Sequence, residues 1–231
     1  MRGDEPEDDK PSGSPVLRFF LKLTILFGGL AACAALLVGM ALALAWPNLP
    51  DLNAMTDYRP RVPLRIFTAD KVMIGEFGEE RRNVLRFNEI PDVMKSAVLA
   101  AEDDRFYQHG GIDWFGVVRA GLTNVIAMSK TQGASTITMQ VARNFYLSSE
   151  KTWSRKFYEL LLTFKIEASL SKDQILELYL NQIYLGNRAY GFAAASRTYL
   201  GKSLSDITPA EAALLAGIPK APSRFNPIAN R

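Results

Sequence analysis

Cysteine and histidine are almost missing from this 231-residue chain, which contains one of each. A single cysteine, Cys33, cannot form an intramolecular disulfide or a cysteine-based metal site, which excludes a secreted scaffold held together by disulfides. With one histidine, His109, neither a serine–histidine–aspartate triad nor a histidine-rich metal site can form unless that residue is the central one.

Charged residues are missing from Leu23 to Pro50. A helix over 23–46 would be roughly 36 Å long, enough to cross a bilayer core of about 30 Å. Arg18 and Lys22 precede this run and Trp46 ends it, as residues at membrane interfaces do. We therefore expect a cytoplasmic tail over 1–22, a transmembrane anchor over 23–46, a linker over 47–63 and a domain outside the cytoplasm over 64–231.

Two alternatives to the anchor stay open. Ala43-Leu44-Ala45 resembles the cleavage site of a signal peptide, although the apolar run is much longer than an ordinary signal core. A buried helix of a soluble domain is the other alternative. The orientation rests on a weak bias, because three arginines follow the run between residues 59 and 65.

The composition excludes several classes of protein. Hydrophobic residues make up 48% of the chain and charged residues 22%, unlike a disordered tail, a collagen or a polytopic membrane protein. Residues 1–22 contain four basic and five acidic side chains, so the net charge of +3 leaves +4 for residues 51–231. This excess is too small to indicate nucleic-acid binding, but it suits an anionic ligand or a membrane surface.

Beyond the linker, the pattern predicts a mainly α domain. Leu64–Phe67 and Val72–Ile74 flank a turn and predict a short hairpin. Ser171 with Gln174, and Thr208 with Glu211, have the spacing of capping boxes. The predicted helix starts are Pro91, Asp113, Ser135, Thr152, Ser171 and Thr208.

Three stretches carry candidate chemistry. In the first, Glu102 ends an apolar helix, where burial would raise its pKa and suit a general base; a solvated helix end is the alternative. His109 in the same stretch is more often structural. In the second, Gly133–Asn144, hydroxyls and free backbone N–H groups at a helix start would hold a phosphate or sugar, or would form an ordinary cap.

The third stretch is the helix that begins near Thr152. Its polar stripe contains Lys156 and Glu159, with Arg155 beside them. This stripe is either a solvated face or a cationic clamp for a diphosphate. The stripe expected to be buried is Trp153, Phe157, Leu160, Leu161, Phe164 and Ala168.

Together these stretches resemble glycosyltransferase family 51, the peptidoglycan glycosyltransferases, which occur as monofunctional enzymes and as the N-terminal half of class A penicillin-binding proteins. Glu102-Asp103-x-x-Phe106-x-x-His109-x-Gly111-x-Asp113 resembles the first family motif. Residues 133–140 resemble the second motif, Arg155-Lys156-x-x-Glu159 the third, and residues 172–181 and 186–202 the later ones. Met139 departs from the pattern, because many members have glutamine there.

The resemblance implies a lysozyme-like fold, with an α-rich head lobe and a smaller, membrane-facing jaw lobe behind a single N-terminal transmembrane helix. Apolar residues that follow the first motif would form the surface of the jaw or, equally, pack in an ordinary core. They are Trp114, Phe115, Val117, Val118, Leu122, Val125, Ile126 and Met128.

The resemblance also implies a hexosyltransferase that polymerises lipid II into glycan strands, with inversion at MurNAc C1 and release of undecaprenyl diphosphate. Glu102 and Glu159 would be catalytic, Glu102 as the base and Glu159 positioning the donor or a divalent cation, Mg²⁺ or Mn²⁺. The implied substrate-binding residues are Asp103, Phe106, His109, Ser135, Thr136, Thr138, Gln140, Arg143, Lys151, Arg155, Lys156 and Asn181.

The implied partners are lipid II, the growing lipid-linked strand, the membrane and unidentified cell-wall synthesis proteins, with no nucleic acid. The implied location is the bacterial inner membrane, with a cytoplasmic N-terminus and a periplasmic domain. The chain would be the N-terminal portion of a bifunctional penicillin-binding protein or a monofunctional transglycosylase. A lysozyme-like enzyme that cleaves glycan and a non-enzymatic anchored scaffold are the rival interpretations.

Overall fold

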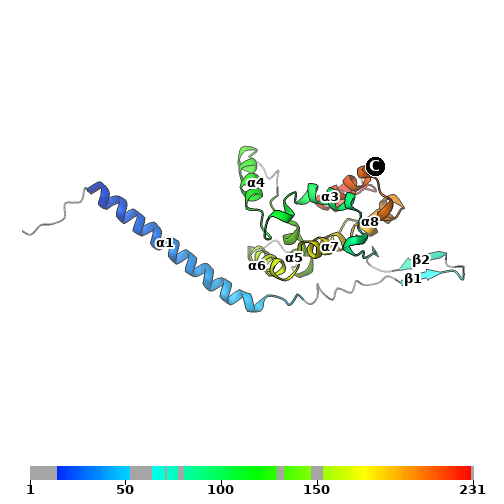
Figure 1. Ribbon diagram of the computed structural model, residues 1–231, viewed down its shortest axis with the longest axis horizontal. Coiled ribbons are helices and arrows are strands. Elements are labelled where there is room, and N and C mark those ends of the chain that lie inside the picture. The colour runs from blue at the N-terminus through cyan, green and yellow to red at the C-terminus, as the bar shows by residue number, and fades with distance from the viewer. Residues whose placement is uncertain are drawn as a thin grey trace, which may run out of the picture. The chain divides into compact units, whose positions relative to one another are not determined.

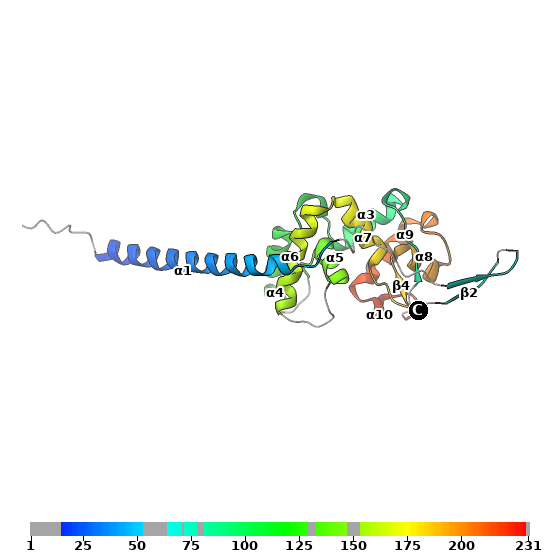
Figure 2. The same ribbon diagram turned by 90° about the horizontal axis from the view of Figure 1, so that it is seen from below.

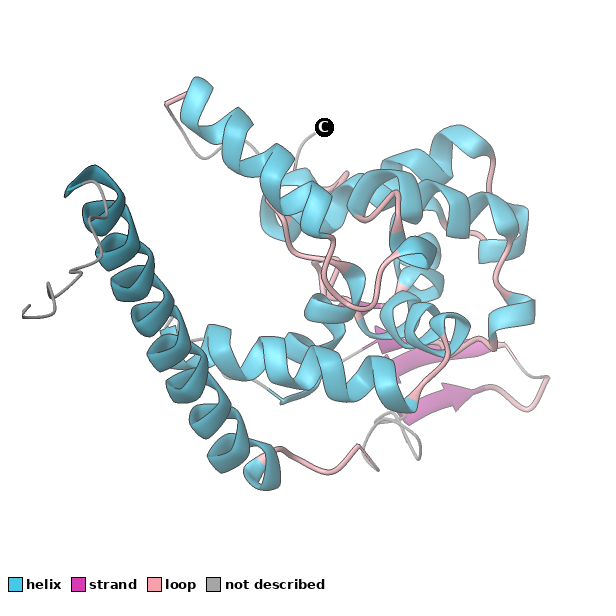
Figure 3. Ribbon diagram, turned by 60° about the vertical axis from the view of Figure 1, so that its left-hand side comes forward, coloured by secondary structure: helices cyan, strands magenta, loops and turns pink. Residues whose placement is uncertain are grey.

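The computed structural model describes residues 15–52, 64–70, 72–77, 81–128, 133–146 and 153–229. The chain forms two compact units, residues 1–48 and residues 49–231. Helices dominate both units, and the few strands are short (Figure 3). This confirms the prediction of a mainly α chain with a long apolar N-terminal helix.

The first unit contains one long helix, α1 (Pro15–Ala45), followed by a 3-10 turn, η1 (Trp46–Asn48) (Figure 1). Among the described residues, one stretch, Val16–Asn48, is long and apolar enough to cross a membrane, with a mean hydropathy of 2.4. Its large side chains are exposed, for example Leu36 at 75%. The helix begins eight residues before the expected anchor, so it includes Arg18 and Lys22, whose long side chains can extend toward a membrane interface.

The predicted linker over 47–63 lies only partly within the described residues. Leu49 and Leu52 are buried in the second unit. Lys165 donates through Nζ to the carbonyl of Pro50 at 2.9 Å, and the Tyr146 hydroxyl donates to the carbonyl of Asp51 at 2.9 Å. The residues directly after α1 and η1 are therefore fixed to the second unit.

The second unit begins with the predicted hairpin, which is confirmed as an antiparallel pair of β1 (Leu64–Phe67) and β2 (Met73–Phe77). A parallel pair of β3 (Arg81–Arg82) and β4 (Ala189–Tyr190) joins distant parts of the chain. Its helices are α3 (Asp92–Glu102), α4 (Trp114–Ile126), α5 (Ile137–Tyr146), α6 (Trp153–Ser169), α7 (Lys172–Gln182), α8 (Phe192–Leu200), α9 (Pro209–Gly217) and α10 (Pro222–Phe225). The 3-10 turns are η2 (Phe87–Glu89), η3 (Phe106–Gln108), η4 (Leu204–Asp206) and η5 (Ile218–Lys220).

Two packing contacts build the core. α3 lies against α9, and each helix contributes buried apolar residues: Met94 and Val98 from α3, and Ala212 and Ala216 from α9. α5 packs between α6 and α7, which lie beside it in Figure 2. Burial of these apolar faces supplies the main stabilisation, roughly 25 cal/mol per Å² of apolar surface removed from water.

The predicted capping boxes are confirmed. At the start of α7, Ser171 Oγ accepts a hydrogen bond from the Gln174 N–H, and Gln174 Oε1 accepts one from the Ser171 N–H. Thr208 and Glu211 do the same for α9. Asp113 stands at the N-cap position of α4, but its side chain makes no cap bond and pairs instead with Arg105.

The predicted buried stripe of α6 is only partly correct: Leu161 is buried and Phe157 and Leu160 are half-buried, whereas the side chain of Trp153 lies outside the described residues. Phe164 and Ala168 are exposed, whereas Glu159 and Thr163 are completely buried. Helix periodicity left a solvated face as one alternative for the polar stripe, but neighbouring cations neutralise Glu159, and Thr163 Oγ1 donates to the Glu159 carbonyl at 2.7 Å. Paired and hydrogen-bonded polar groups can occupy a core face that a hydrophobicity pattern assigns to solvent.

A buried asparagine fixes the segment before α3. Asn181 on α7 accepts from the Leu85 N–H at 2.9 Å and donates to the Leu85 carbonyl at 2.8 Å. Gly191, with φ of +79°, passes directly over Asn181, and a Cβ there would lie 2.6 Å from the Asn181 carbonyl oxygen. These contacts leave Asn181 with a structural role.

We expect Asn181→Ala to lower the free energy of unfolding by about 2 kcal/mol, because two backbone groups of Leu85 lose their partner. Thermal denaturation of the full chain in detergent should show a melting temperature lower by about 4–8 °C. Asn88→Ala, which removes an exposed asparagine, is the matched control. Equal melting temperatures for the two variants would contradict the structural role.

Candidate active site

Glu102 is the last residue of α3, at the edge of an open cavity of about 570 Å³. The neighbouring helix α5 supplies Gln140, whose side-chain amide donates through Nε2 to Glu102 Oε2 at 2.7 Å. Backbone and side chains from α3, α5 and η5 line the cavity around these two residues. Glu102 is thus half-buried and faces the open space of the cavity, as a residue that exchanges protons with a ligand must.

The surroundings of Glu102 favour its protonated form. Burial raises the pKa of this carboxyl above its ordinary value of 4.5, and the charge of Asp103 adds to the rise. The hydrogen bond from Gln140 and the charge of Lys220 oppose it and are outweighed. This rise brings the pKa of the carboxyl group closer to neutral pH, and the ionised carboxylate is then a stronger base.

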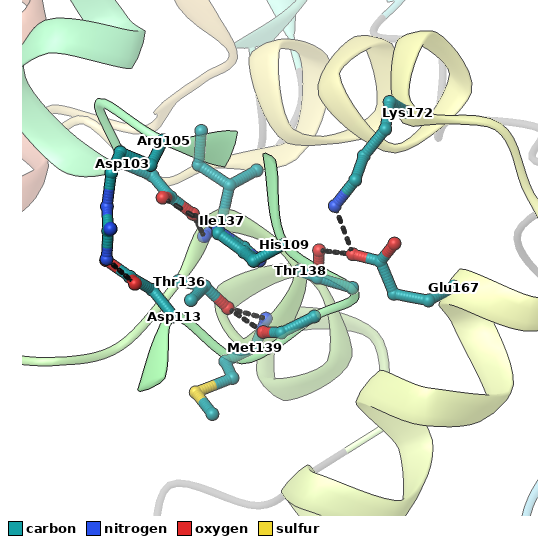
Figure 4. A network of polar contacts seen from close by, with 11 residues as sticks. Asp103, Arg105, His109, Asp113, Thr136, Ile137, Thr138, Met139, Glu167 and Lys172 are labelled. Atoms are coloured by element: carbon teal, nitrogen blue, oxygen red, sulfur yellow. Dashed lines mark hydrogen bonds and ion pairs between the residues drawn. The ribbon is translucent and has the colours of Figure 1, made fainter. Parts of the chain in front are cut away.

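Asp103, the next residue, also lines the cavity, but it is buried and its carboxylate bonds within the protein. Its carboxylate accepts from the backbone N–H of Ile137, the first residue of α5, at 3.0 Å (Figure 4). His109 Nε2 lies 3.0 Å from the other carboxylate oxygen. The positive end of the α5 dipole and the imidazole both stabilise the buried acid. These contacts agree with the structural interpretation of His109.

The hydroxyls of the second motif also bond within the protein. Thr136 Oγ1 donates to the Gly111 carbonyl at 2.6 Å and accepts from the Met139 N–H, which makes Thr136 the N-cap of α5. Thr138 Oγ1 donates to Glu167, which also accepts from Lys172 (Figure 4). Ser135 faces the cavity, whereas Thr138 is completely buried away from it.

Glu159, on α6, is completely buried among cations. Arg143 on α5 donates to it through Nε at 3.2 Å and Nη2 at 3.0 Å, and Lys156 donates through Nζ at 2.5 Å. Arg143 Nη2 also reaches Ser135 Oγ at 3.3 Å and lines the cavity. Of the two alternatives for the polar stripe of α6, the solvated face is therefore wrong for Glu159, which anchors a cationic cluster.

The cations decide the charge of Glu159. Burial alone would raise the pKa of its carboxyl, but hydrogen bonds from Arg143 and Lys156 outweigh burial and hold the pKa below the ordinary value of 4.5. Both oxygens of Glu159 already accept from cations. A divalent cation does not fit there, and the described ranges contain no group of three or more His, Cys, Asp or Glu able to hold one.

Among the described residues, Phe106, Asn181 and Arg155 do not line the cavity. Phe106 is completely buried, with Lys172 Nζ 4.4 Å from its ring centroid, and Asn181 holds Leu85. Arg155 Nη1 lies 4.0 Å from Glu159, a looser contact than those of Arg143 and Lys156. Lys151 lies outside the described residues.

Two cavity residues were missed by sequence reasoning. Arg119 on α4 and Lys220 on η5 line the cavity with Glu102 and Arg143. Neither belongs to a charged cluster in the sequence, so only the folded arrangement of α4 and η5 reveals them. They add two positive charges to a cavity that three acids, Glu102, Asp103 and Asp104, also line.

Helix α4 exposes an apolar face to its surroundings. Val118, Leu122, Val125 and Ile126 are between 60% and 82% exposed, and Met128 is 95% exposed. The alternative of ordinary core packing is wrong for these residues. An exposed apolar patch of this kind marks a contact surface for another protein or a membrane.

Comparison with known proteins agrees with this site. The model of the family described as Transglycosylase matches residues 70–231. The chain is 56% identical over 205 residues to penicillin-binding protein 1A of Neisseria gonorrhoeae, covering 89% of this chain and 26% of that protein. It is 52% identical over 213 residues to a putative transglycosylase of Cupriavidus necator, covering 91% of this chain and 81% of that protein.

Among solved structures, penicillin-binding protein 1A from Haemophilus influenzae is 30% identical and matches 74% of this chain with a TM-score of 0.38. The chain spans about a quarter of the length of the penicillin-binding proteins it matches. The family match covers both acidic motifs and the cavity. The chain therefore belongs to the transglycosylase family, in agreement with its resemblance to glycosyltransferase family 51.

Proposed function

We propose that the chain is a peptidoglycan glycosyltransferase, a hexosyltransferase that joins lipid II to a growing lipid-linked glycan strand. One observation carries the proposal: a carboxylate with a raised pKa, Glu102, shares an open cavity with the cations Arg119, Arg143 and Lys220. Glycosyl transfer from a diphosphate needs a base for the attacking hydroxyl and positive charge for the leaving group.

Glu102 takes the proton of the 4-hydroxyl of the acceptor's GlcNAc. At the same time the oxygen of this hydroxyl bonds to C1 of the donor's MurNAc. The C1–oxygen bond to the diphosphate breaks with inversion, and the electron pair leaves with undecaprenyl diphosphate. Gln140 holds one carboxylate oxygen of Glu102 and so orients the base. The carboxylate is the acceptor for the proton, so it must be ionised before the reaction.

Arg143 faces the leaving diphosphate. Glu159 acts on the diphosphate indirectly, by holding Arg143 in place. The two hydrogen bonds from Arg143 to Glu159 fix the guanidinium at the cavity wall, where a flexible cation would lose its orientation. Lys156 is held by the same carboxylate. Glu159 is therefore a positioning residue for two cations, which replaces the expectation that it contacts the donor or a metal ion.

We expect Glu102→Gln to abolish polymerisation of lipid II without unfolding the chain, because the amide cannot accept the proton. In the unchanged chain, activity should fall as the pH decreases through the raised pKa of Glu102, since the base is then protonated. Gel analysis of glycan strands across a pH series measures both effects. Full activity of Glu102→Gln would refute the assignment.

We expect Glu159→Gln to reduce polymerisation on the order of tenfold or more, because Arg143 and Lys156 lose the charge that holds them. Its effect on melting temperature should be large at neutral pH and shrink as the pH falls through the lowered pKa of Glu159, where the native carboxylate becomes protonated. Asp92→Asn, which breaks an exposed pair with Lys95, is the control. A change below twofold would contradict the positioning role.

The membrane location extends this proposal. α1 anchors the chain in the bacterial inner membrane with a cytoplasmic N-terminus and a periplasmic second unit. The exposed apolar face of α4 rests on the same membrane, and Arg119 on that helix lines the cavity. A lipid-linked substrate would then keep its diphosphate near Arg119 while its chain stays in the bilayer.

We expect Ile126→Glu to slow polymerisation of long-chain lipid II in proteoliposomes by about tenfold. An isoleucine side chain that enters the membrane contributes about 1.5–3 kcal/mol to the contact, and the glutamate loses this contribution. Polymerisation of a short-chain, water-soluble lipid II analogue should be unaffected. Leu214→Glu places the same charge at a 46% exposed leucine of α9 and should leave both rates unchanged. Equal slowing with both substrates would argue against membrane contact.

Incubation with lipid II and, separately, with purified glycan distinguishes synthesis from cleavage. The basic residues of the cavity, Arg119, Arg143 and Lys220, favour synthesis, because hydrolysis of glycan leaves no diphosphate for them to neutralise. Product strands from lipid II support the proposal, and glycan fragments in the second reaction would favour the lysozyme-like alternative.

A further inference from the structure

The residues that follow η1, 49–52, form a strap on the second unit. The sequence predicts a linker over this stretch, yet Leu49 and Leu52 are only 6% and 7% exposed. An unattached linker in water would leave both leucines exposed. Burial of an apolar side chain at each end therefore holds the strap on the unit.

The backbone of the strap joins two helices. Lys165 on α6 donates through Nζ to the Pro50 carbonyl at 2.9 Å, and the Tyr146 hydroxyl on α5 donates to the Asp51 carbonyl at 2.9 Å. Neighbouring carbonyls of one short segment thus accept hydrogen bonds from α5 and from α6. The strap is therefore a cross-link between these two helices.

The strap contacts α5 at the end that carries a functional cation. Tyr146 is the last residue of α5, and Arg143 lies in the same last turn. The carbonyl groups of a last turn have no partners within the helix, and helix ends open more readily than helix centres. The bond from Tyr146 to the strap holds this turn closed, close to the guanidinium that reaches Glu159.

The partner of Arg143 belongs to the other helix that the strap contacts. Glu159 is on α6, six residues before Lys165, which is about 9 Å along the helix axis. α5 and α6 pack against each other along this stretch of the fold. Neither the strap nor its two donors line the cavity, so the strap acts on the ion pair from outside the site.

We propose that Tyr146 and Lys165 are positioning residues for Arg143, which they hold through the strap. The strap keeps the last turn of α5 against α6, so that the guanidinium stays on Glu159 and keeps its orientation at the cavity wall. When the strap is released, this turn opens more often and Arg143 leaves Glu159 more often. The catalytic part of this inference rests on the proposed function, because it takes Arg143 as a cation that faces the leaving diphosphate.

The test combines Tyr146→Phe with Lys165→Met, which removes both donors to the strap while keeping side chains of similar size. Nitrogen-15 NMR of the full chain in detergent, labelled at arginine and assigned with Arg143→Lys, follows solvent exchange of the Arg143 Nε proton. In the unchanged chain this proton is protected by its hydrogen bond to Glu159 Oε2. We expect its exchange to become about tenfold faster, as the loss of two hydrogen bonds of ordinary strength allows.

A second variant, Leu49→Ser with Leu52→Ser, releases the strap at its apolar ends and leaves both donors in place. It should accelerate the same exchange. The matched control is Tyr107→Phe with Lys95→Met, which removes one tyrosine donor and one lysine donor that bond elsewhere in the unit. The control should leave the exchange of the Arg143 proton unchanged.

The rate of lipid II polymerisation supplies a double-mutant cycle. Alone, Tyr146→Phe with Lys165→Met should slow polymerisation by about fivefold. Combined with Glu159→Gln, the same two changes should cause no further loss, because Arg143 has then already lost the carboxylate that holds it. A strap that only stabilised the fold would lower the melting temperature and leave the two losses of rate additive.

Unchanged exchange of the Arg143 proton in both strap variants, or additive losses of rate in the cycle, would overturn the inference. The exchange measurement needs no activity. Faster exchange in a chain that fails to polymerise lipid II would therefore reject the proposed function while supporting the role of the strap.

Discussion

The site depends on one hydrogen bond between distant segments, from the backbone N–H of Ile137 to the carboxylate of Asp103. It joins the end of α3 to the start of α5. Once this end is fixed, helix geometry places Gln140 and Arg143, three residues apart, on one face of α5. Gln140 reaches Glu102 and Arg143 reaches Glu159, so a single helix start sets the contacts of both glutamates.

This arrangement separates two kinds of acid that look alike in the sequence. Glu102 is at the cavity with a raised pKa, whereas Glu159 is buried among cations with a lowered one. Burial acts on both, and the outcome is decided by whether cations donate to the carboxylate. A base and a permanent anion can therefore be made from the same residue type by the choice of neighbours.

Much of the fold follows from local signals in the sequence. The capping boxes of α7 and α9 and the hairpin of β1 and β2 are correct because short-range chemistry determines them. The predicted buried stripe of α6 was wrong at Phe164 and Ala168, because periodicity cannot detect that Arg143, from another helix, neutralises Glu159 and lets it be buried. The structural roles of Asp103, Thr138 and Asn181 were missed for the same reason, since their partners lie more than 25 residues away.

Part of the cavity wall consists of residues with little or no side chain: Ala100, Ala101, Ala216, Gly217 and Pro219. Their size, not their chemistry, sets the width of the cavity on that side. A larger side chain at any of them would narrow the space while leaving every charge described above in place. The size of ligand that the cavity admits can therefore change through these positions without any change in its charged groups.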